Sequence, residues 1–244
     1  MYYPDYHASP LTGRGGSSSS ISGDSTSKGE IADGGSPPQS TPQSPIEGWS
    51  IDDVNTPQSG EGQPGISCEY EATSCGGSAP GQHRGVDWSL GIGNEGYVNP
   101  ILGGTVVSSD ANIQYPYGVS MVVETPAAQL SFAMQQALGI QNGQSVYILY
   151  AHIRQWAPPG WTGEFPDPIT IGTDVNPGER IGMVGNTGTD LAHLHVEVQI
   201  GPTGLDFGSL AKSSEGYRLW FDPIELQRIN PLDLYGLEYP ASGS

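Results

Sequence analysis

Positive charge is scarce in this chain of 244 residues. It carries 8 Lys+Arg against 26 Asp+Glu, which gives a formal net charge of -18 at pH 7. Binding to nucleic acids depends on Lys and Arg side chains that neutralise phosphates. We therefore expect no nucleic-acid partner, and binding to an anionic polymer would have to rest on local contacts.

Long apolar runs are also missing. A membrane-spanning helix needs roughly 18 or more consecutive apolar residues, and the best run, residues 146–153, is short and interrupted by His152. Residues 1–6 show neither the basic nor the apolar region of a secretory signal. We expect no membrane span, and no signal peptide is visible in this chain.

Cysteine is limited to Cys68 and Cys75. A disulfide between them would close a short loop and contribute about 2 to 3 kcal/mol in an oxidising compartment. Two free thiols in a reducing compartment are the alternative, and the sequence leaves this open. Two cysteines are too few for a zinc site built from thiolates.

Large apolar residues are sparse before residue 66, where Gly, Pro, Ser and Thr dominate. Such a segment buries too little apolar surface to offset the entropy of ordering. The sequence therefore predicts a disordered tail or linker over 1–66, a folded domain over 67–236 and a C-terminal tail over 237–244. Within the first tail, Trp49 and Ile51 could dock on the domain or lie in an exposed loop.

Short apolar runs separated by Gly, Pro and Asn fill the folded domain, which is typical of an all-β sandwich or barrel. Residues 126–138, rich in Ala, Leu and Gln and followed by Gly139, predict an inserted helix with a glycine stop. Residues 155–178 predict a long irregular loop. A short element is expected over 218–226, and residues 230–232 end the domain. Strands are expected at 85–90, 105–108, 119–124, 145–151, 180–184 and 194–200.

Two histidines stand two residues apart in the last predicted strand. On a strand, His193 and His195 share one face, whereas Leu194 and Val196 point into the core. Their Cα atoms would lie about 7 Å apart, so both imidazoles could serve one pocket. Taken alone, this pattern fits a functional pair and a solvated polar face equally well.

His83 and Asp87 are four residues apart, which is about 13 Å in an extended chain and too far for one ion with bonds of about 2.0–2.2 Å. Gly85 between them permits the bend that one ion requires. Taken alone, the spacing of His83 and Asp87 is a weak signal for a metal site. Taken alone, His152 would be interpreted as a buried core histidine at the end of a strand. Together with the histidine pair, these residue types match a catalytic zinc site with three N or O ligands and an open position for water.

The order His-x-x-x-Asp, then Tyr-x-His, then His-x-His resembles the M23 family of zinc peptidases, the lysostaphin and LytM-like endopeptidases. The resemblance spans roughly residues 80–236 and includes the glycine-rich segment 176–188 and the closing residues 230–232. It implies an all-β, mainly antiparallel fold of the LytM or duplicated-hybrid-motif type, to which the small helix expected within residues 126–138 is an insertion.

By this resemblance, the zinc ligands are His83, Asp87 and His195, and the catalytic residues are His152 and His193. His193 would act as the general base, and His152 would polarise the attacking water or stabilise the oxyanion. The resemblance implies one Zn2+ per chain, hydrolysis of peptide bonds in peptidoglycan stem peptides or cross-bridges, and an extracellular or cell-envelope location. We expect a monomer.

The chain also departs from the family pattern. Leu191-Ala192 and Val196 replace the Gly-Pro and Phe that usually flank the family's His-x-His, and segments 126–138 and 155–178 are longer than its usual connections. The bond that is cut and access to the groove therefore stay open. A non-catalytic binding or regulatory module of the cell envelope is the alternative function, while a sugar phosphotransfer carrier is disfavoured by Asp87 and the full ligand set.

Three further features receive no role in the predicted site. Residues 91–96 match a dinucleotide-binding fingerprint, but strand-like residues follow where a helix should begin, so they predict a turn. Glu197 faces the same way as the two histidines and could lie near a ligand or in solvent. Tyr115 and Tyr117 are assigned to packing rather than to the groove.

Overall fold

The computed structural model describes residues 41–60, 62–73, 83–110, 117–154, 157, 160, 162–167, 169–205 and 226–236. These residues belong to one unit of the chain, Ser36–Ser244. Some of the predicted features lie outside the described residues, namely most of the first tail (1–40), the C-terminal tail (237–244), residues 218–225 of the expected short element, Cys75 and Tyr115.

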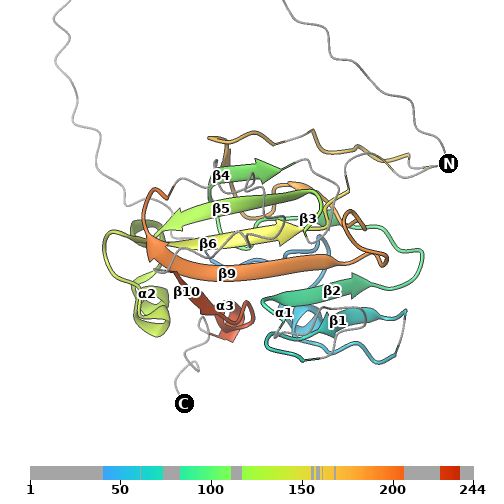
Figure 1. Cartoon of the computed structure of the whole chain (residues 1–244), viewed down its shortest axis with the longest axis horizontal. Helices are drawn as coiled ribbons and strands as arrows, with labels where there is room; N and C mark the ends of the chain where they lie inside the picture. Colours follow the sequence, from blue (N-terminus) through green and yellow to red (C-terminus); the bar gives the residue numbers. More distant parts are fainter. Residues whose placement is uncertain are drawn as a thin grey trace, which may run out of the picture. The chain divides into compact units, whose positions relative to one another are not determined.

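Eight strands form one sheet, in the order β1-β2-β9-β6-β5-β4-β7 with β10 also paired to β9 (Figure 1). Every pairing between these strands is antiparallel, and β10 continues along the edge of β9 that β2 occupies. The strands are β1 (Pro64–Cys68), β2 (Val86–Leu90), β4 (Gly104–Asp110), β5 (Ser120–Pro126), β6 (Gln144–Ala151), β7 (Asp174–Val175), β9 (Leu194–Pro202) and β10 (Gln227–Ile229).

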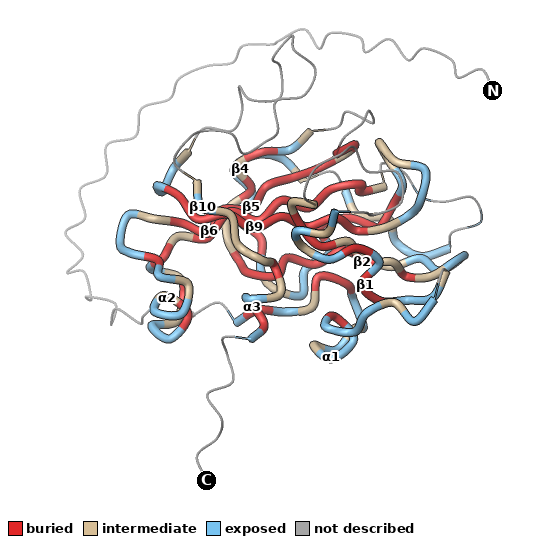
Figure 2. Tube along the Cα trace, turned by 60° about the horizontal axis from the view of Figure 1, so that its bottom comes forward, coloured by how far each residue is buried: buried red, intermediate tan, exposed pale blue. Residues whose placement is uncertain are grey.

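The two central strands, β6 and β9, are buried along nearly their whole length (Figure 2). Alternate residues point to opposite faces of the sheet. One face of β9 joins the main apolar core through Leu194, Val196 and Val198. The other face carries His195 and Glu197 beside a small second apolar cluster. The sheet thus separates an apolar face, which stabilises the fold, from a face with buried polar groups.

A two-stranded sheet, β3 (Tyr97–Val98) with β8 (Gly182–Met183), packs on the main core through Val98 and Val184. Short helices α1 (Ile51–Val54) and α3 (Asp233–Gly236) also lie against this core, into which Val54 and Leu234 are buried. The predicted all-β, mainly antiparallel class is confirmed, and the main sheet is open rather than a closed barrel in the part of the chain described. None of the described helices has the length and apolar character needed to cross a membrane.

Residues 46–60 and 62–66 are folded, which corrects the prediction that the tail extends to residue 66. Ile46 and Val54 are 1% and 0% exposed, and Trp49 and Ile51 pack against the core. Burial of one large apolar side chain contributes about 1.5–3 kcal/mol. A few buried side chains of this kind therefore keep the segment folded, although its average composition is typical of disordered chains.

The inserted helix is shorter than predicted. Helix α2 covers only Phe132–Leu138, because the Ser131 side chain caps its first turn and Gly139 ends it in the left-handed conformation. Residue Pro126 instead completes β5, where it pairs with Ser145, and a 3-10 turn follows it. The glycine stop is confirmed, and the first half of the predicted helix is wrong.

The other differences are local. Residues 174 and 175, predicted to lie in an irregular loop, form β7 because Val175 is buried and pairs with Gly104 of β4. The predicted strand 180–184 is reduced to the two residues of β8. The turn predicted at 91–96 is present, with positive φ at Gly91 and Gly93.

Candidate active site

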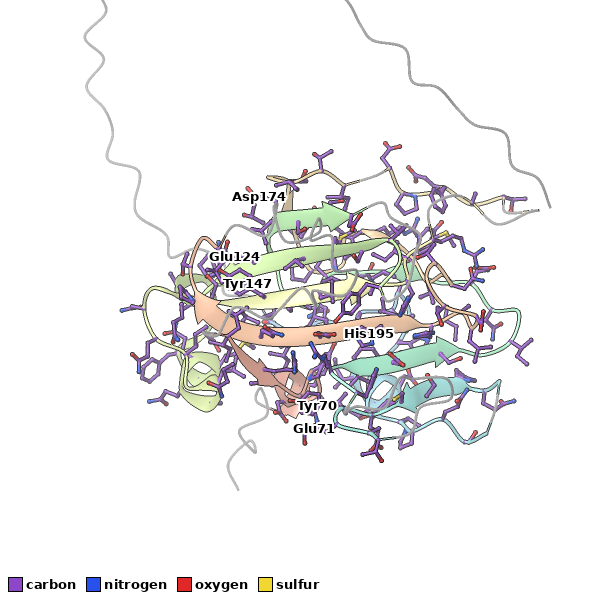
Figure 3. The ribbon with its side chains drawn as sticks, in the orientation of Figure 1. Tyr70, Glu71, Glu124, Tyr147, Asp174 and His195 are labelled. Carbon is purple, nitrogen blue, oxygen red and sulfur yellow. The ribbon has the colours of Figure 1, made fainter. Side chains whose placement is uncertain are left out.

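Antiparallel pairing brings the predicted site residues together. Asp87 of β2 stands opposite His195 of β9. On the other side of β9, His195 stands opposite Ala151 of β6, and His152 follows Ala151 in the chain. His83 precedes β2 and His193 precedes β9. Four histidines and one aspartate from three segments therefore meet near one end of β9, where Figure 3 labels His195.

Three side-chain atoms converge at this end of the sheet. Asp87 Oδ1 lies 2.7 Å from His195 Nδ1 and 3.2 Å from His83 Nε2, and the two nitrogens are 3.1 Å apart. Ligand atoms around a tetrahedral zinc ion with bonds of 2.0–2.2 Å are separated by roughly 3.3 Å. We call His83, Asp87 and His195 the His-Asp-His triad, and its spacing and donor types fit a zinc ion.

The bend between His83 and Asp87 depends on Gly85 in a different way from the one predicted. Gly85 does not adopt a positive φ. Instead, a Cβ atom at this position would lie 2.0 Å from the carbonyl oxygen of Val196. The absence of a side chain lets the chain pass directly against β9, and this contact brings His83 to Asp87 and His195.

The remaining two imidazoles have fixed tautomers. His193 Nδ1 lies 2.9 Å from the carbonyl oxygen of Leu191, and His152 Nδ1 lies 2.8 Å from that of Thr187. A carbonyl only accepts hydrogen bonds, so both Nδ1 atoms carry a proton. In the neutral rings, each Nε2 therefore keeps its lone pair. His193 Nε2 faces the triad, 3.7 Å from Asp87 Oδ2, and the rings of His152 and His193 are 4.5 Å apart between centroids.

His152 has a strained backbone, with φ of 60°. This left-handed conformation is unfavourable for a residue other than glycine and is concentrated at functional sites. Thr187 stabilises it, because its carbonyl accepts from His152 while its hydroxyl donates to Ile153 O and accepts from Val119 N, both at 2.9 Å. Thr187 is not among the residues predicted from the sequence, where its only signal is its place in a glycine-rich segment.

Electrostatics within the site favour positive charge at its centre. Burial raises the pKa of Asp87, but hydrogen bonds from His195 and His83 outweigh it and hold that pKa well below its usual range. Burial lowers the pKa of His195, but hydrogen bonds to Asp87 and Glu197 raise it to about 10. Without a metal, the proton on His195 therefore supplies the positive charge that Asp87 requires.

The two outer histidines are neutral at pH 7. Burial, reinforced by the neighbouring His193 and His195, lowers the pKa of His152 to about 3. Burial also lowers the pKa of His193, although the Asp87 carboxylate opposes the shift. A neutral imidazole with a free Nε2 can accept a proton at physiological pH.

Cys68 also lies near the triad, and its sulfur is 3.1 Å from His83 Nδ1. Cys68, His83 and Asp87 offer atoms within 4.8 Å of one another that could surround a metal. Cys68 is disulfide-bonded, however, so it provides no thiolate. His83 Nδ1 also lies 2.9 Å from Glu69 O and donates to it, which leaves Nε2 for the triad. The set that includes His195 is therefore the better metal site.

Two further buried groups contact the triad. Glu197 Oε1 lies 3.2 Å from His195 Nε2, and Tyr117 donates its hydroxyl proton to the same oxygen at 2.5 Å. Neither residue was predicted to have a role in the site. The shared strand face was a signal for Glu197, but nothing in the sequence links Tyr117 to a residue 80 positions away.

No family model and no curated protein matches this sequence. Similar solved structures include a zinc-containing peptidase from Vibrio cholerae, 21% identical over 55% of this chain and 32% of that one, with a TM-score of 0.34. Lysostaphin from Staphylococcus simulans is 22% identical over 55% of this chain and 42% of that one, with a TM-score of 0.35. In a SpoIIQ–SpoIIIAH pore-forming complex, the matched chain is 16% identical over 66% of this chain and 84% of that one, with a TM-score of 0.41.

The structural neighbours include M23 peptidases. This chain spans 32% and 42% of the lengths of the first two peptidases, which is less than half of each. At these identities and TM-scores the likeness concerns the fold alone, and we derive no activity from it. The chemistry of the site has to be argued from its own residues.

Proposed function

We propose that this chain is a zinc-dependent endopeptidase that hydrolyses peptide bonds in the stem peptides or cross-bridges of bacterial peptidoglycan. The observation that carries the proposal is the spacing of His83 Nε2, Asp87 Oδ1 and His195 Nδ1, which lie 2.7–3.2 Å from one another. One zinc ion per chain would be held by these three atoms. The substrate class comes from the M23-like order of the site residues in the sequence.

A zinc ion held by the triad would act as a Lewis acid and lower the pKa of a bound water toward neutrality. The protein's own contribution is to hold proton acceptors beside that position. His193 is suited to be the general base, because its Nδ1 is committed to Leu191 O and its Nε2 faces the triad.

The geometry supports one of the two roles predicted for His152. Because Nδ1 donates to Thr187 O, the neutral ring offers only a lone pair at Nε2. Stabilising an oxyanion would require a second N–H, and the pKa of about 3 disfavours that protonation at pH 7. We therefore assign His152 to accepting a hydrogen bond from the attacking water rather than to donating one to the oxyanion.

The test uses the purified chain and insoluble peptidoglycan. We expect about one zinc per chain, clearing of peptidoglycan in a gel, and release of peptide fragments that mass spectrometry identifies. His193→Ala should abolish clearing and keep its zinc, because the triad is intact in this variant. A zinc-loaded chain that binds peptidoglycan without cleaving it would contradict the proposal and favour the binding-module alternative.

The same proposal places the chain outside the cell or in the cell envelope, acting as a monomer on peptidoglycan peptides. Fractionation of the producing cells and the mass of the protein in solution would test these two points. Recovery of the protein only from the cytoplasm would contradict the proposed location.

A further inference from the structure

The ring of His195 has a hydrogen-bond partner on each side. Nδ1 faces Asp87 Oδ1 at 2.7 Å, and Nε2 faces Glu197 Oε1 at 3.2 Å. A carboxylate only accepts, so Nε2 carries a proton toward Glu197. If a cation replaces the proton on Nδ1, the ring can stay in the Nε2–H form without moving.

Glu197 is itself held in place. Tyr117, which lies just before β5, donates to Glu197 Oε1 at 2.5 Å. Glu197 is 1% exposed and Tyr117 is 8% exposed, so both groups are removed from water. A continuous chain of hydrogen bonds therefore runs from the Tyr117 hydroxyl through Glu197 to the imidazole of His195.

The stability of the fold alone would not favour the buried carboxylate of Glu197. Glu197 Oε2, the second oxygen, is buried and receives no hydrogen bond from the described residues; it forms a long ion pair with Arg228, whose Nε at 4.0 Å is too far away to donate to it. A buried carboxylate oxygen that receives no hydrogen bond weakens a fold. Its contact with His195 provides a functional reason for a carboxylate at this position.

We propose that Glu197, oriented by Tyr117, is a positioning residue that fixes the Nε2–H tautomer of His195 and thereby presents Nδ1 to the metal. The inference rests on the proposed function, because it concerns the same zinc site. Groups that orient a metal ligand in this way contribute about 10- to 100-fold to metal affinity.

The chain offers a matched control on the same strand. Gln199 is the next residue on this face of β9, is 1% exposed, and within the described part of the chain has no hydrogen-bond partner on either amide atom. It stands opposite Tyr147 on β6, whereas His195 stands opposite Ala151. Gln199→Leu therefore measures the general effect of replacing a buried polar side chain here.

The experiment measures zinc affinity of the full chain by competition with a chromophoric chelator. Glu197→Leu keeps the volume but removes the acceptor, and it should weaken zinc binding about 10- to 100-fold. Glu197→Gln keeps a neutral acceptor and should lose less, since hydrogen bonds to charged groups are stronger. Tyr117→Phe should lose less than Glu197→Leu, and Gln199→Leu should stay within about twofold of the wild type.

Nitrogen NMR of the zinc-loaded protein with labelled histidine gives a readout independent of activity. The wild type and Gln199→Leu should show His195 protonated at Nε2, whereas Glu197→Leu should show altered shifts for that ring. Wild-type zinc affinity and unchanged shifts in Glu197→Leu would overturn the inference. If that variant does not fold, the same result in Glu197→Ala, which also removes the acceptor, would overturn it.

Different results would contradict the proposed function and the positioning role of Glu197. A wild-type chain that binds no zinc removes the proposed function, and this inference falls with it. A wild type that binds zinc and clears peptidoglycan, with affinity unchanged in the Glu197 variants, leaves the function standing and removes only the positioning role.

Discussion

Two buried polar clusters lie on one face of the sheet, at opposite ends of β6 and β9, as the labels of Glu124, Tyr147 and His195 show (Figure 3). In the first, Glu124 Oε1 accepts hydrogen bonds from Ser145 Oγ, Tyr147 OH and Gly204 N at 2.7–3.0 Å. In the second, the His-Asp-His triad brings one carboxylate oxygen and two imidazole nitrogens within 2.7–3.2 Å of one another.

The two clusters differ in how fully their polar atoms are hydrogen-bonded. This difference distinguishes a structural cluster from a candidate functional one. Around Glu124, one carboxylate oxygen is matched by three donors, and such a satisfied network stabilises and specifies a fold. At the triad, three atoms that can each accept a proton or bind a cation are held within hydrogen-bond distance, and Asp87 is 13% exposed. The second arrangement, unlike the first, presents three atoms that a cation could bind.

The largest effect should follow from breaking the triad. Asp87→Ala removes the one carboxylate among its three atoms, so zinc content should fall from about one per chain to near zero and clearing should be lost. Asp174→Ala, an exposed aspartate of β7, is the matched control and should keep both. Zinc retained at full occupancy in Asp87→Ala would show that the metal binds elsewhere.

Replacing His152, whose backbone is strained, should lower activity equally in two variants that differ in stability. His152→Ala and His152→Gly should each lose about 100-fold in kcat/KM, because the acceptor beside the reacting water is removed. The glycine variant should be more stable than the alanine variant by about 1 kcal/mol, since φ of 60° suits glycine. Chemical denaturation with zinc present measures this, and equal stability would mean that the strain is absent.

Removing the Glu124 carboxylate should lower stability and leave zinc binding unchanged. Glu124→Ala removes the acceptor of Gly204 N, while the hydroxyls of Ser145 and Tyr147 keep Thr203 Oγ1 and the carbonyl oxygen of Pro202 as partners. The free energy of unfolding should therefore fall by about 1–3 kcal/mol. Zinc content should be unchanged, because this carboxylate is at the far end of β6 and β9. Loss of zinc from a folded Glu124→Ala protein would mean that the two clusters are not independent.

The smallest effect is the pH dependence of catalysis. Burial lowers the pKa of His193 from its ordinary 6.5. The general base is neutral above its folded pKa, so kcat/KM should be maintained as the pH falls to about 6.5 and decline only below it. A pH profile on zinc-loaded protein, with zinc content checked at each point, measures this. A decline that begins above that pH would exclude His193 as the base.

Sequence patterns identified the strands whose alternation is regular, above all β6 and β9, because one of their faces is continuously apolar. They also selected the five site residues that the fold brings together, although their roles stay predictions. The docking of Ile46 and Val54 was missed, since isolated apolar residues in a segment rich in Gly, Pro and Ser give no periodic signal. The contacts of Thr187 with His152 and of Tyr117 with Glu197 join distant segments, so they depend on the sheet topology rather than on any local spacing.

Diffraction from crystals of the zinc-loaded chain at the zinc absorption edge tests the central claim most directly. We predict one anomalous peak per chain, bonded to His83 Nε2, Asp87 Oδ1 and His195 Nδ1 at about 2.0–2.2 Å. A peak bonded to the sulfur of Cys68 instead, or no peak within reach of these three atoms, would contradict it.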